Sequence, residues 1–561
     1  MRRRLILPVI PLAIAGLVLA GCATQTVATT PASDTSTATT QATVEIDSDL
    51  DTDAVIAADE GATVVNDDEW SASDAVDIEL TGDTASTAED VEVDGSTVTI
   101  TAAGVYRLTG SLDGSVVVAA PEDALVVLIL DDADIANTEG AAIEAVTADD
   151  VAISLADGSV NGISAASDTA AIHADTDLTI TGTGSLEVSA DGNDGIASTD
   201  DLAILSGTIT VDAADDALRG KDALVVEGGT LDLAAGGDAL KSDEDQDATR
   251  GYIWISGGDV TATAGDDGLA AATDAVVTGG TIDLTTTGSD GAKGVNAGAV
   301  IAIDGGEVTI DAADDGLHSD GSIGIGGGTV TVSSGDDGIH AEAALEIRDG
   351  VVTVLQSYEG LEATDITISG GAVDITADDD GVNASGGSSG SGGQGGMGGG
   401  MADTGETLTI SGGTLTVSAQ GDGLDSNGSM TITGGDTTVF GPTNDGNGAL
   451  DTNGGLTVSG GTVLAVGSAG MAETPDSSSA QQWIAATLSA AAGDEIEITD
   501  ASGQVIASFT TEKQLASLVY TSPHIVDGAT YTITVNGSAA ATVTEGTAIA
   551  GGGMGGGPGR R

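Results

Sequence analysis

Acidic turns that recur along the middle of the chain are the residues best suited to chemistry. From about residue 190 to 465 a Gly-Gly pair and a β-branched segment lead into an Asp-Asp-Gly turn, as in GGDVTATAGDDGL and GGEVTIDAADDGL. Carboxylates and backbone carbonyls are the hard oxygen ligands that calcium prefers. The turns therefore predict calcium sites, although solvated Asx turns would use the same residues. The predicted calcium ligands are Asp194, Asp215, Asp216, Asp266, Asp267, Asp314, Asp315, Asp336, Asp337, Asp379, Asp380, Asp422 and Asp445.

Basic side chains are scarce, and most of them stand three residues past a turn acid. Arg219, Lys241, Lys293, His318 and His340 occupy this position. Such a row predicts either a groove that hydrogen-bonds sugar hydroxyls and carboxylates or local neutralisation of the acids. The two histidines could ligate a metal, but no third soft ligand accompanies them in the sequence, so we expect ordinary polar partners.

Three aromatic residues near the repeats are candidates for contact with a sugar ring. Tyr252 and Trp254 lie beside the loop of a long interval between two turn acids, and Tyr358 directly precedes Glu359. An aromatic face can pack on a pyranose ring, but each of these residues could equally fill a gap between repeats. The predicted carbohydrate-binding residues are Arg219, Lys241, Lys293, His318, His340, Tyr252, Trp254 and Tyr358.

The spacing of the turn acids indicates which elements hold them. Most successive turn acids are 21 to 25 residues apart, which is typical of one coil of a parallel β-helix. We predict an all-β fold, a right-handed single-stranded parallel β-helix of about 22-residue coils with a small C-terminal β element. Equivalent acids would then stack at about 4.8 Å. Like charges at that distance repel unless cations lie among them.

Other segments flank or interrupt the repeats. Low hydrophobicity predicts disorder, and Gly-rich composition predicts flexibility. The predicted segments are a disordered Thr/Ala/Ser/Asp tether at residues 22–60, the β-helix carbohydrate-binding domain at 75–475 with a flexible Gly-rich insertion at 384–405, a C-terminal antiparallel β cap at 477–545 and a Gly-rich tail at 546–561.

The first residues predict export and lipid attachment. Arg2, Arg3 and Arg4 precede an apolar run that ends in Leu-Ala-Gly-Cys, which is typical of a bacterial lipoprotein signal peptide over residues 1–21. Cys22 is the only cysteine, so it is the predicted lipidation site and no disulfide can form. We expect a protein held by lipid on the extracellular face of the cell membrane.

Composition excludes several classes of partner. The chain has 89 acidic and 13 Lys or Arg residues, a net charge of −76, which disfavours binding to nucleic acid or anionic lipid. Only 2% of the residues are aromatic, so the core must consist of stacked aliphatic side chains. We expect a monomer whose partner is a polysaccharide.

Several longer motifs carry a resemblance to a known family. They include GNDGIASTDDLAI, DDALRGKDALVV, GGDALKSDEDQDATRGYIWISGG, GGTVLAVGSAGMAE and TSPHIVDGATYTITV. The chain from about residue 75 to 540 resembles the bacterial carbohydrate-binding domain family of parallel β-helix cell-surface proteins, which is akin in fold to pectate lyases. The resemblance implies binding of cellulose and pectic chains, calcium in the acidic turns and no established lyase activity. The Asp-Asp-Gly pattern is incomplete at Asp216, Asp238 and Glu359.

Three functions are compatible with these patterns. The first is calcium-assisted, non-catalytic polysaccharide binding. The second is a calcium-dependent pectate lyase in which Arg219 or Lys241 abstracts the proton next to a uronate carboxylate. The third is an adhesin or cell-wall scaffold. We predict the first, because the acidic turns are uniform and no coil is marked as catalytic.

Overall fold

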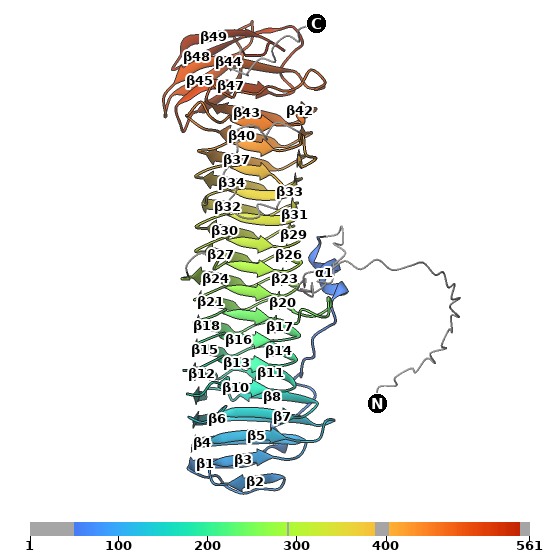
Figure 1. Cartoon of the computed structure of the whole chain (residues 1–561), viewed down its shortest axis with the longest axis vertical. Coiled ribbons are helices and arrows are strands. Elements are labelled where there is room, and N and C mark those ends of the chain that lie inside the picture. Colours follow the sequence, from blue (N-terminus) through green and yellow to red (C-terminus); the bar gives the residue numbers. More distant parts are fainter. Residues whose placement is uncertain (1–49, 289–290, 387–402, 550–561) are drawn as a thin grey trace, which may run out of the picture. The chain divides into compact units, whose positions relative to one another are not determined.

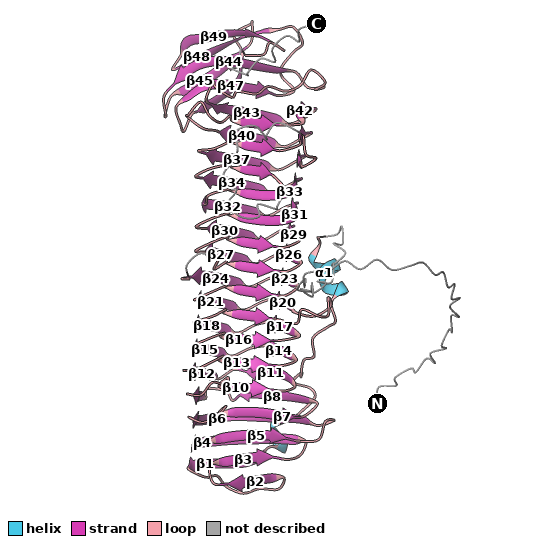
Figure 2. Ribbon diagram, viewed as in Figure 1, coloured by secondary structure: helices cyan, strands magenta, loops and turns pink. Residues whose placement is uncertain are grey.

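A parallel β-helix forms most of the described part of the chain, as the repeat predicts (Figures 1 and 2). The computed structural model describes residues 50–288, 291–386 and 403–549. The predicted signal peptide, Cys22, most of the predicted tether, the centre of the Gly-rich insertion and the end of the tail lie outside these residues. Within the described ranges, no helix is long and apolar enough to cross a membrane.

Each regular coil contributes one strand to each of three parallel sheets, and each strand pairs with the strand three positions later in the chain. Sheet 1 contains β7 (Ile143–Thr147), β10 (Ile172–Ala174), β13 (Ile196–Ser198), β16 (Leu218–Gly220), β19 (Leu240–Ser242), β22 (Leu269–Ala271), β25 (Val295–Ala297), β28 (Leu317–Ser319), the first parts of β31 (Ile339–Ile347) and β33 (Leu361–Ile368), β35 (Val382–Ala384), β38 (Leu424–Ser426) and β41 (Leu450–Thr452). Sheet 2 contains β8 (Asp150–Leu155), β11 (Asp177–Gly182), β14 (Asp201–Ile204), β17 (Ala223–Val226), β20 (Tyr252–Ile255), β23 (Asp274–Val277), β26 (Val300–Ile303), β29 (Ser322–Ile325), the second parts of β31 and β33, β36 (Thr407–Ile410), β39 (Ser429–Ile432) and β42 (Gly455–Val458). Sheet 3 contains β9 (Val160–Ala165), β12 (Ser185–Ala190), β15 (Thr208–Ala213), β18 (Thr230–Ala235), β21 (Asp259–Ala264), β24 (Thr281–Thr286), β27 (Glu307–Asp311), β30 (Thr329–Ser333), β32 (Val351–Gln356), β34 (Ala372–Ala377), β37 (Thr414–Ala419), β40 (Asp436–Phe440) and β43 (Thr462–Gly467).

Alternation along the sheet 3 strands builds the core. In β21, Val260 and Ala262 are buried, whereas Thr261 and Thr263 face solvent, as the period of two requires. Val260 pairs in register with Ile282 of the next coil. Aliphatic side chains therefore stack in rows, and each fully buried one contributes about 1.5–3 kcal/mol.

The Gly-Gly pairs mark a bend where neighbouring coils come very close. Gly280 has a φ of +89°, a conformation that residues with a side chain rarely adopt. A Cβ at Gly280 would also lie 2.9 Å from the carbonyl oxygen of Gly258 in the preceding coil. The glycines are thus required both by the backbone conformation and by the stacking distance.

Both ends of the β-helix depart from the regular coil. At the start, β4 (Gly104–Asp113) pairs in parallel with β1 (Val76–Gly82) and with β6 (Leu125–Asn137). β3 (Thr97–Ile100) pairs in parallel with β5 (Ser115–Ala119) and antiparallel with β2 (Val91–Asp94). At the other end, β47 (Leu515–Thr521) pairs antiparallel with β43 and with β44 (Trp483–Ala490). A separate antiparallel sheet contains β45 (Glu495–Thr499), β46 (Val505–Thr510), β48 (Thr530–Val535) and β49 (Ser538–Thr544). The predicted C-terminal β element is confirmed.

An ordered segment, residues 50–70, runs along sheet 2 against the direction of the coils (Figure 1). We name it the strap. It contains α1 (Thr52–Ala58), capped by Asp51, and is followed by the short helix η1 (Ala72–Asp74). Val55 packs against Val276 and Ala302. The predicted disordered tether therefore extends too far, because residues 50–60 bury apolar side chains on sheet 2.

Strap hydrogen bonds reach coils that are far apart in the sequence. The carbonyl oxygen of Leu50 accepts from Arg348 Nη2 at 3.1 Å, and Thr52 N–H donates to Asp304 Oδ2 at 3.0 Å. Further along, Thr63 N–H donates to Asp201 Oδ2 at 2.7 Å. One short segment thus contacts a series of consecutive coils.

Candidate functional site

The turn acids form a continuous column between sheet 3 and sheet 1. In most coils one carboxylate oxygen accepts the backbone N–H of the equivalent residue in the next coil, for example Asp216 Oδ1 from Asp238 at 2.9 Å and Asp238 Oδ1 from Asp267 at 2.9 Å. The second oxygen has no such partner in the backbone. We call these positions the turn column: Asp194, Asp216, Asp238, Asp267, Lys293, Asp315, Asp337, Glu359, Asp380 and Asp422.

Two residues lie at positions other than the predicted ones: Lys293, predicted in the basic row, and Asp445, predicted as a column acid. The backbone N–H that follows Asp267 in the column belongs to Lys293, at 2.8 Å, so this lysine occupies an acid position. The N–H that follows Asp422 belongs to Gly448, and Asp445 is exposed and lies outside the column. The loops of these two coils differ in length from the others, so counting from the last acid of each motif gave the wrong register.

The preceding acids of the double-acid turns lie further out than the column. Asp215, Asp266 and Asp336 are exposed, and Asp314 and Asp379 are half-buried. Carboxylate oxygens come within 4.8 Å of one another in three groups: Asp194 with Asp215 and Asp216, Asp238 with Asp266 and Asp267, and Asp314 with Asp315 and Asp336. The predicted pairing of neighbouring acids around a single ion is thus geometrically possible in these turns.

The middle residues of the sheet 1 strands form a second line beside the turn column. We call it the strand row: Ala197, Arg219, Lys241, Ala270, Asn296, His318, His340, Glu362, Asn383, Asp425 and Asp451. Lys293, predicted in this row, is replaced there by Asn296. Asp451 also belongs to the row, although the sequence analysis does not select it. Its motif ALDT resembles the GLDS of the preceding coil, and this likeness was the signal for it.

Two lysines, Lys241 and Lys293, form ion pairs with acids of the coils from Asp216 to Asp315. We call these coils the lysine-bridged coils. Lys241 Nζ lies 3.0 Å from Asp216 Oδ2 and 2.8 Å from Asp238 Oδ2. Lys293 Nζ lies 2.6 Å from Asp314 Oδ2 and 3.4 Å from Asp315 Oδ2. Burial lowers the pKa of Lys241, but the contacts with Asp238 and Asp216 outweigh it and raise the pKa above its ordinary value. A permanent positive charge therefore lies between the stacked acids.

The column has no comparable partners over Glu359 to Glu473, which we call the unbridged coils. Within the described ranges, no Lys, Arg or His lies within ion-pair distance of Glu359, Asp380, Asp422, Asp425, Asp451 or Glu473. Burial, followed by repulsion from Glu362, raises the pKa of Glu359 to about 8. Burial and repulsion from Asp380 raise the pKa of Asp422 and of Asp425 to about 7.

A buried amide oxygen also lacks a partner in the unbridged coils. Asn383 is 8% exposed, and its Nδ2 donates to Glu359 Oε2 at 2.8 Å. Its Oδ1 accepts no hydrogen bond, and Asn383 pairs in register with Asp425 of the next coil. Carboxylates and a free amide oxygen make a donor set that fits calcium, so the residues present fit the ion that the sequence predicts.

The two histidines lie in adjacent coils beside the column. His318 Nδ1 is 3.0 Å from Asp315 Oδ2, and His340 Nδ1 is 3.6 Å from Asp337 Oδ2. Burial lowers the pKa of His318, but the contacts with Asp315 and Asp320 outweigh it and raise the pKa to about 9. Both rings thus have the polar partners that the sequence predicts, and these partners are carboxylates.

The predicted aromatic contacts divide into covered and exposed residues. Tyr252 is 3% exposed, and its hydroxyl donates to Glu60 O and accepts from Ala62 N–H, both at 3.0 Å. Trp254 is half-buried and packs against the apolar cluster that contains the strap residue Val55. The strap thus covers Tyr252 and lies beside Trp254, and Tyr358, 49% exposed beside the turn column, offers the most open ring of the three to a sugar.

Neither predicted catalytic base is free to accept a proton. Arg219 Nη2 lies 2.7 Å from Asp243 Oδ2, and its pKa is raised by that contact although burial lowers it. Lys241 is held between two carboxylates. A general base works best with a pKa near the operating pH, so these environments do not favour proton abstraction.

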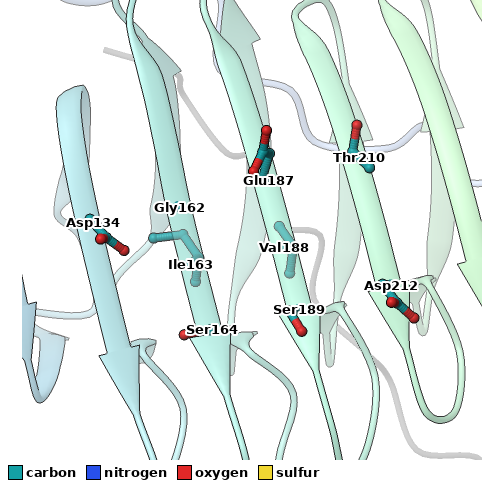
Figure 3. A pocket seen from close by; sticks show the side chains of 9 residues that line it. All are labelled: Asp134, Gly162, Ile163, Ser164, Glu187, Val188, Ser189, Thr210 and Asp212. Atoms are coloured by element: carbon teal, nitrogen blue, oxygen red, sulfur yellow. The ribbon is translucent and has the colours of Figure 1, made fainter.

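A shallow hollow lies apart from the column, on the outer face of sheet 3 (Figure 3). Gly162 lies in register between Asp134 and Glu187 and leaves space where its neighbours carry side chains. Hydroxyl and carboxylate groups of Ser164, Ser189, Thr210 and Asp212 line the rest, together with the aliphatic Ile163 and Val188. The hollow therefore has a mixed lining, without a basic group among its residues.

The fold is a parallel β-helix with an acidic column along one edge, and comparison with known proteins identifies its family. The sequence model of a family described as "carbohydrate-binding domain-containing protein" matches residues 94–338 and 321–404, more than half of the chain. The chain therefore belongs to this family.

Two individual proteins are similar to the chain. A carbohydrate-binding domain-containing protein of Acetivibrio thermocellus is 38% identical over 128 residues, which are 21% of this chain and 45% of the relative. The match thus spans less than half of that relative. A solved structure, described as the polysaccharide lyase-like protein from C. thermocellum in a gadolinium derivative, is 32% identical over 40% of this chain and 96% of its own, with a TM-score of 0.37.

Proposed function

We propose that the protein binds an acidic polysaccharide of the pectic type, without cleaving it, through calcium ions held in the unbridged coils. Membership of a carbohydrate-binding family supports the ligand class. The observation that carries the site is a set of partly buried acids that have no basic partner among the described residues, namely Glu359, Asp380, Asp422, Asp425, Asp451 and Glu473. A bare acidic surface repels uronate chains, whereas one loaded with divalent cations attracts them.

Calcium would be held mainly by Asp380, Asn383, Asp422 and Asp425. These residues supply oxygen ligands from two adjacent coils, which pair in register. Calcium accepts six to eight oxygen ligands in flexible geometry and can therefore keep positions for sugar carboxylates. Tyr358, exposed at the edge of these coils, would pack on a sugar ring.

Binding without cleavage is favoured over the lyase alternative by the state of the basic residues. Proton abstraction needs a neutral base next to a cation site, and both Arg219 and Lys241 have raised pKa values and carboxylate partners. Neither lies in the unbridged coils. A polysaccharide bound in the unbridged coils would thus lie away from the two basic residues that the lyase alternative requires.

Titration calorimetry with polygalacturonate, run beside an absorbance assay for unsaturated products, tests the proposal. We expect saturable binding that requires calcium and no new absorbance. The variant Asp422→Asn/Asp425→Asn should lose this binding, whereas the matched variant Asp215→Asn/Asp266→Asn, in the lysine-bridged coils, should retain it. Binding unaffected by chelation would contradict the calcium part, and rising absorbance would identify a lyase.

We also propose that the protein is lipidated at Cys22 and held on the outer face of the membrane. The Leu-Ala-Gly-Cys motif after a short apolar run supports this proposal. Mass spectrometry of the mature amino terminus from the native host should find a diacylglyceryl-modified cysteine. Wild-type protein in the membrane fraction and Cys22→Ala protein outside it would agree, and identical fractionation of both would contradict lipid attachment.

A further inference from the structure

Two imidazoles from consecutive coils meet beside the turn column. His318 of β28 and His340 of β31 pair in register, and their rings pack edge to face with centroids 5.0 Å apart. The other two histidines of the chain, His173 and His524, lie far from them in the sequence. The histidine pair therefore stands out beside the turn column, which itself consists of acidic residues and Lys293.

A carboxylate lies within reach of both rings. Asp315 Oδ2 is 3.0 Å from His318 Nδ1 and 4.0 Å from His340 Nδ1, and one ligand atom from each of the three residues lies within 4.8 Å of the others. Zinc bonds of about 2.0–2.2 Å place tetrahedral ligands about 3.3–3.6 Å apart. The three groups therefore need to move by about 1 Å or less to bind one ion.

Two of the four imidazole nitrogens are buried without a hydrogen bond, whereas His318 Nε2 forms one with Asp320 Oδ1 at 3.4 Å. His318 Nδ1 and His340 Nε2 are both buried without a hydrogen-bond partner, although the first lies close to Asp315 at an angle that does not make a hydrogen bond. The side chains are only 14% and 16% exposed. Buried nitrogens beside carboxylates, without hydrogen bonds, are poised as ligands rather than as structural donors.

Further acids surround the three ligands. Asp337 Oδ2 lies 3.6 Å from His340 Nδ1, and Glu362 Oε2 lies 3.9 Å from His340 Nε2. These residues form a second possible ligand group with His340. The surroundings can thus complete the coordination of a divalent ion and balance its charge.

We propose that Asp315, His318 and His340 bind one divalent transition-metal ion of the zinc type, with Asp337 as the nearest further ligand. Two imidazoles and a carboxylate suit zinc, cobalt or nickel, whereas calcium takes oxygen ligands alone. The ion would join two consecutive coils at the boundary between the lysine-bridged and unbridged coils. The site is independent of the calcium that we propose in the unbridged coils.

Zinc calorimetry and cobalt absorption on the purified full-length protein, both in excess calcium, test this site. We expect one zinc ion per chain and a cobalt spectrum with the intense visible bands of nitrogen-containing, low-coordinate geometry. His340→Ala should lower the zinc affinity by about 100-fold or more, since even indirect partners of a metal contribute 10- to 100-fold. The row accepts alanine, because Ala270 occupies the equivalent position three coils before His340.

A matched variant separates the histidine pair from histidine in general. His173 lies at the same position of β10, between Glu144 and Ala197, so His173→Ala should bind zinc as the wild type does. Calcium binding should be the same in His340→Ala and wild type, which distinguishes this site from the calcium proposal. Equal zinc affinity in His318→Ala/His340→Ala and wild type, with equal melting temperatures in chelator, would overturn the inference.

Discussion

The lysine-bridged coils and the unbridged coils share one backbone register but neutralise their acids differently. Between Asp216 and Asp315 the ammonium groups of Lys241 and Lys293 lie between stacked carboxylates. Between Glu359 and Glu473 the same column has no such group, and the pKa values of its acids are raised. One stretch carries its own cations, and the other must take up protons or metal ions.

This difference shows what a parallel β-helix requires of its side chains. Parallel strand pairing holds equivalent residues of successive coils about 4.8 Å apart. Charges in one coil therefore cannot move away from those in the next. Backbone hydrogen bonds to the carboxylates hold the column in both stretches. Only the source of positive charge varies along the column, and the following experiments change that source.

Removal of calcium should have the largest effect, and it should depend on pH. Glu359 has a pKa of about 8, and Asp422, Asp425 and Glu473 have pKa values of about 7, against about 4 when unfolded. Between pH 4 and 8 the folded protein thus binds more protons than the unfolded one, so its stability in chelator falls as pH rises. We expect a lower melting temperature at pH 8 than at pH 5.

Calcium should remove this loss. A ligand at 100 times its Kd stabilises the folded state by about 2.7 kcal/mol per site, and calcium competes best where the acids are ionised, at pH 8. Melting curves at both pH values, with and without calcium, measure the effect. Equal melting temperatures in chelator at pH 5 and pH 8 would mean that repulsion between the ionised acids does not destabilise the folded protein.

Lys241→Met should turn part of the lysine-bridged stretch into an unbridged one. The variant leaves Asp216 and Asp238 without their shared cation. Breaking a fully buried pair costs about 3–5 kcal/mol, and a side chain that is 30% exposed should lose less, about 2 kcal/mol. Denaturant unfolding should show this loss in chelator and its partial recovery with calcium. The control Lys221→Met, whose partner is Glu244 outside the column, should show no such recovery.

Asp425→Asn should make the opposite change in the unbridged coils. Asparagine is accepted there, since Asn383 holds the equivalent position one coil earlier. Removal of one repelling carboxylate should stabilise the chelated protein at pH 8 by about 1 kcal/mol and reduce the gain from calcium. Asp232→Asn, on the exposed face of sheet 3, is the matched control. A destabilised Asp425→Asn in chelator would contradict the repulsion.

Tyr358→Ala should have the smallest effect and should act on binding alone. The ring is 49% exposed, so its loss should leave the melting temperature unchanged. A sugar packed on an aromatic face gains about 1 kcal/mol, or roughly a fivefold change in Kd. Calorimetry with polygalacturonate measures this change, and Val505→Ala, an exposed apolar residue of the C-terminal cap, should not alter it. Equal affinities in both variants would place the sugar elsewhere.

The sequence predicts the coil well because the same pattern of glycines and aliphatic residues recurs in every repeat. Gly280 and its equivalents fix the bend, and residues such as Val260 and Ile282 fix the inward rows. The errors at Lys293 and Asp445 arise where loop length changes, because hydrogen-bond register, not the last acid of a motif, decides the column.

The strap and the metal ligands around the histidines were harder to foresee. Residues 50–70 have the polar composition of a linker, but Asp51 as a helix cap and the apolar Val55, Ile56 and Val65 were signals of order. Tyr252 and Trp254 were misinterpreted because nothing in their own motif shows what covers them. For His318 and His340, the third ligand comes from a turn, and only the register places it beside both rings.

The strap gives this solenoid long-range connectivity that repeat proteins otherwise lack. In a stack of coils each unit touches only its nearest neighbours, so unfolding can fray from either end and stop at any coil. A single segment bonded to Arg348, Asp304, Asp201 and Thr179 makes those coils open together or not at all. Hydrogen exchange should therefore be cooperative from β11 to β31 and graded from β33 onward, where the strap makes no hydrogen bond with the described residues.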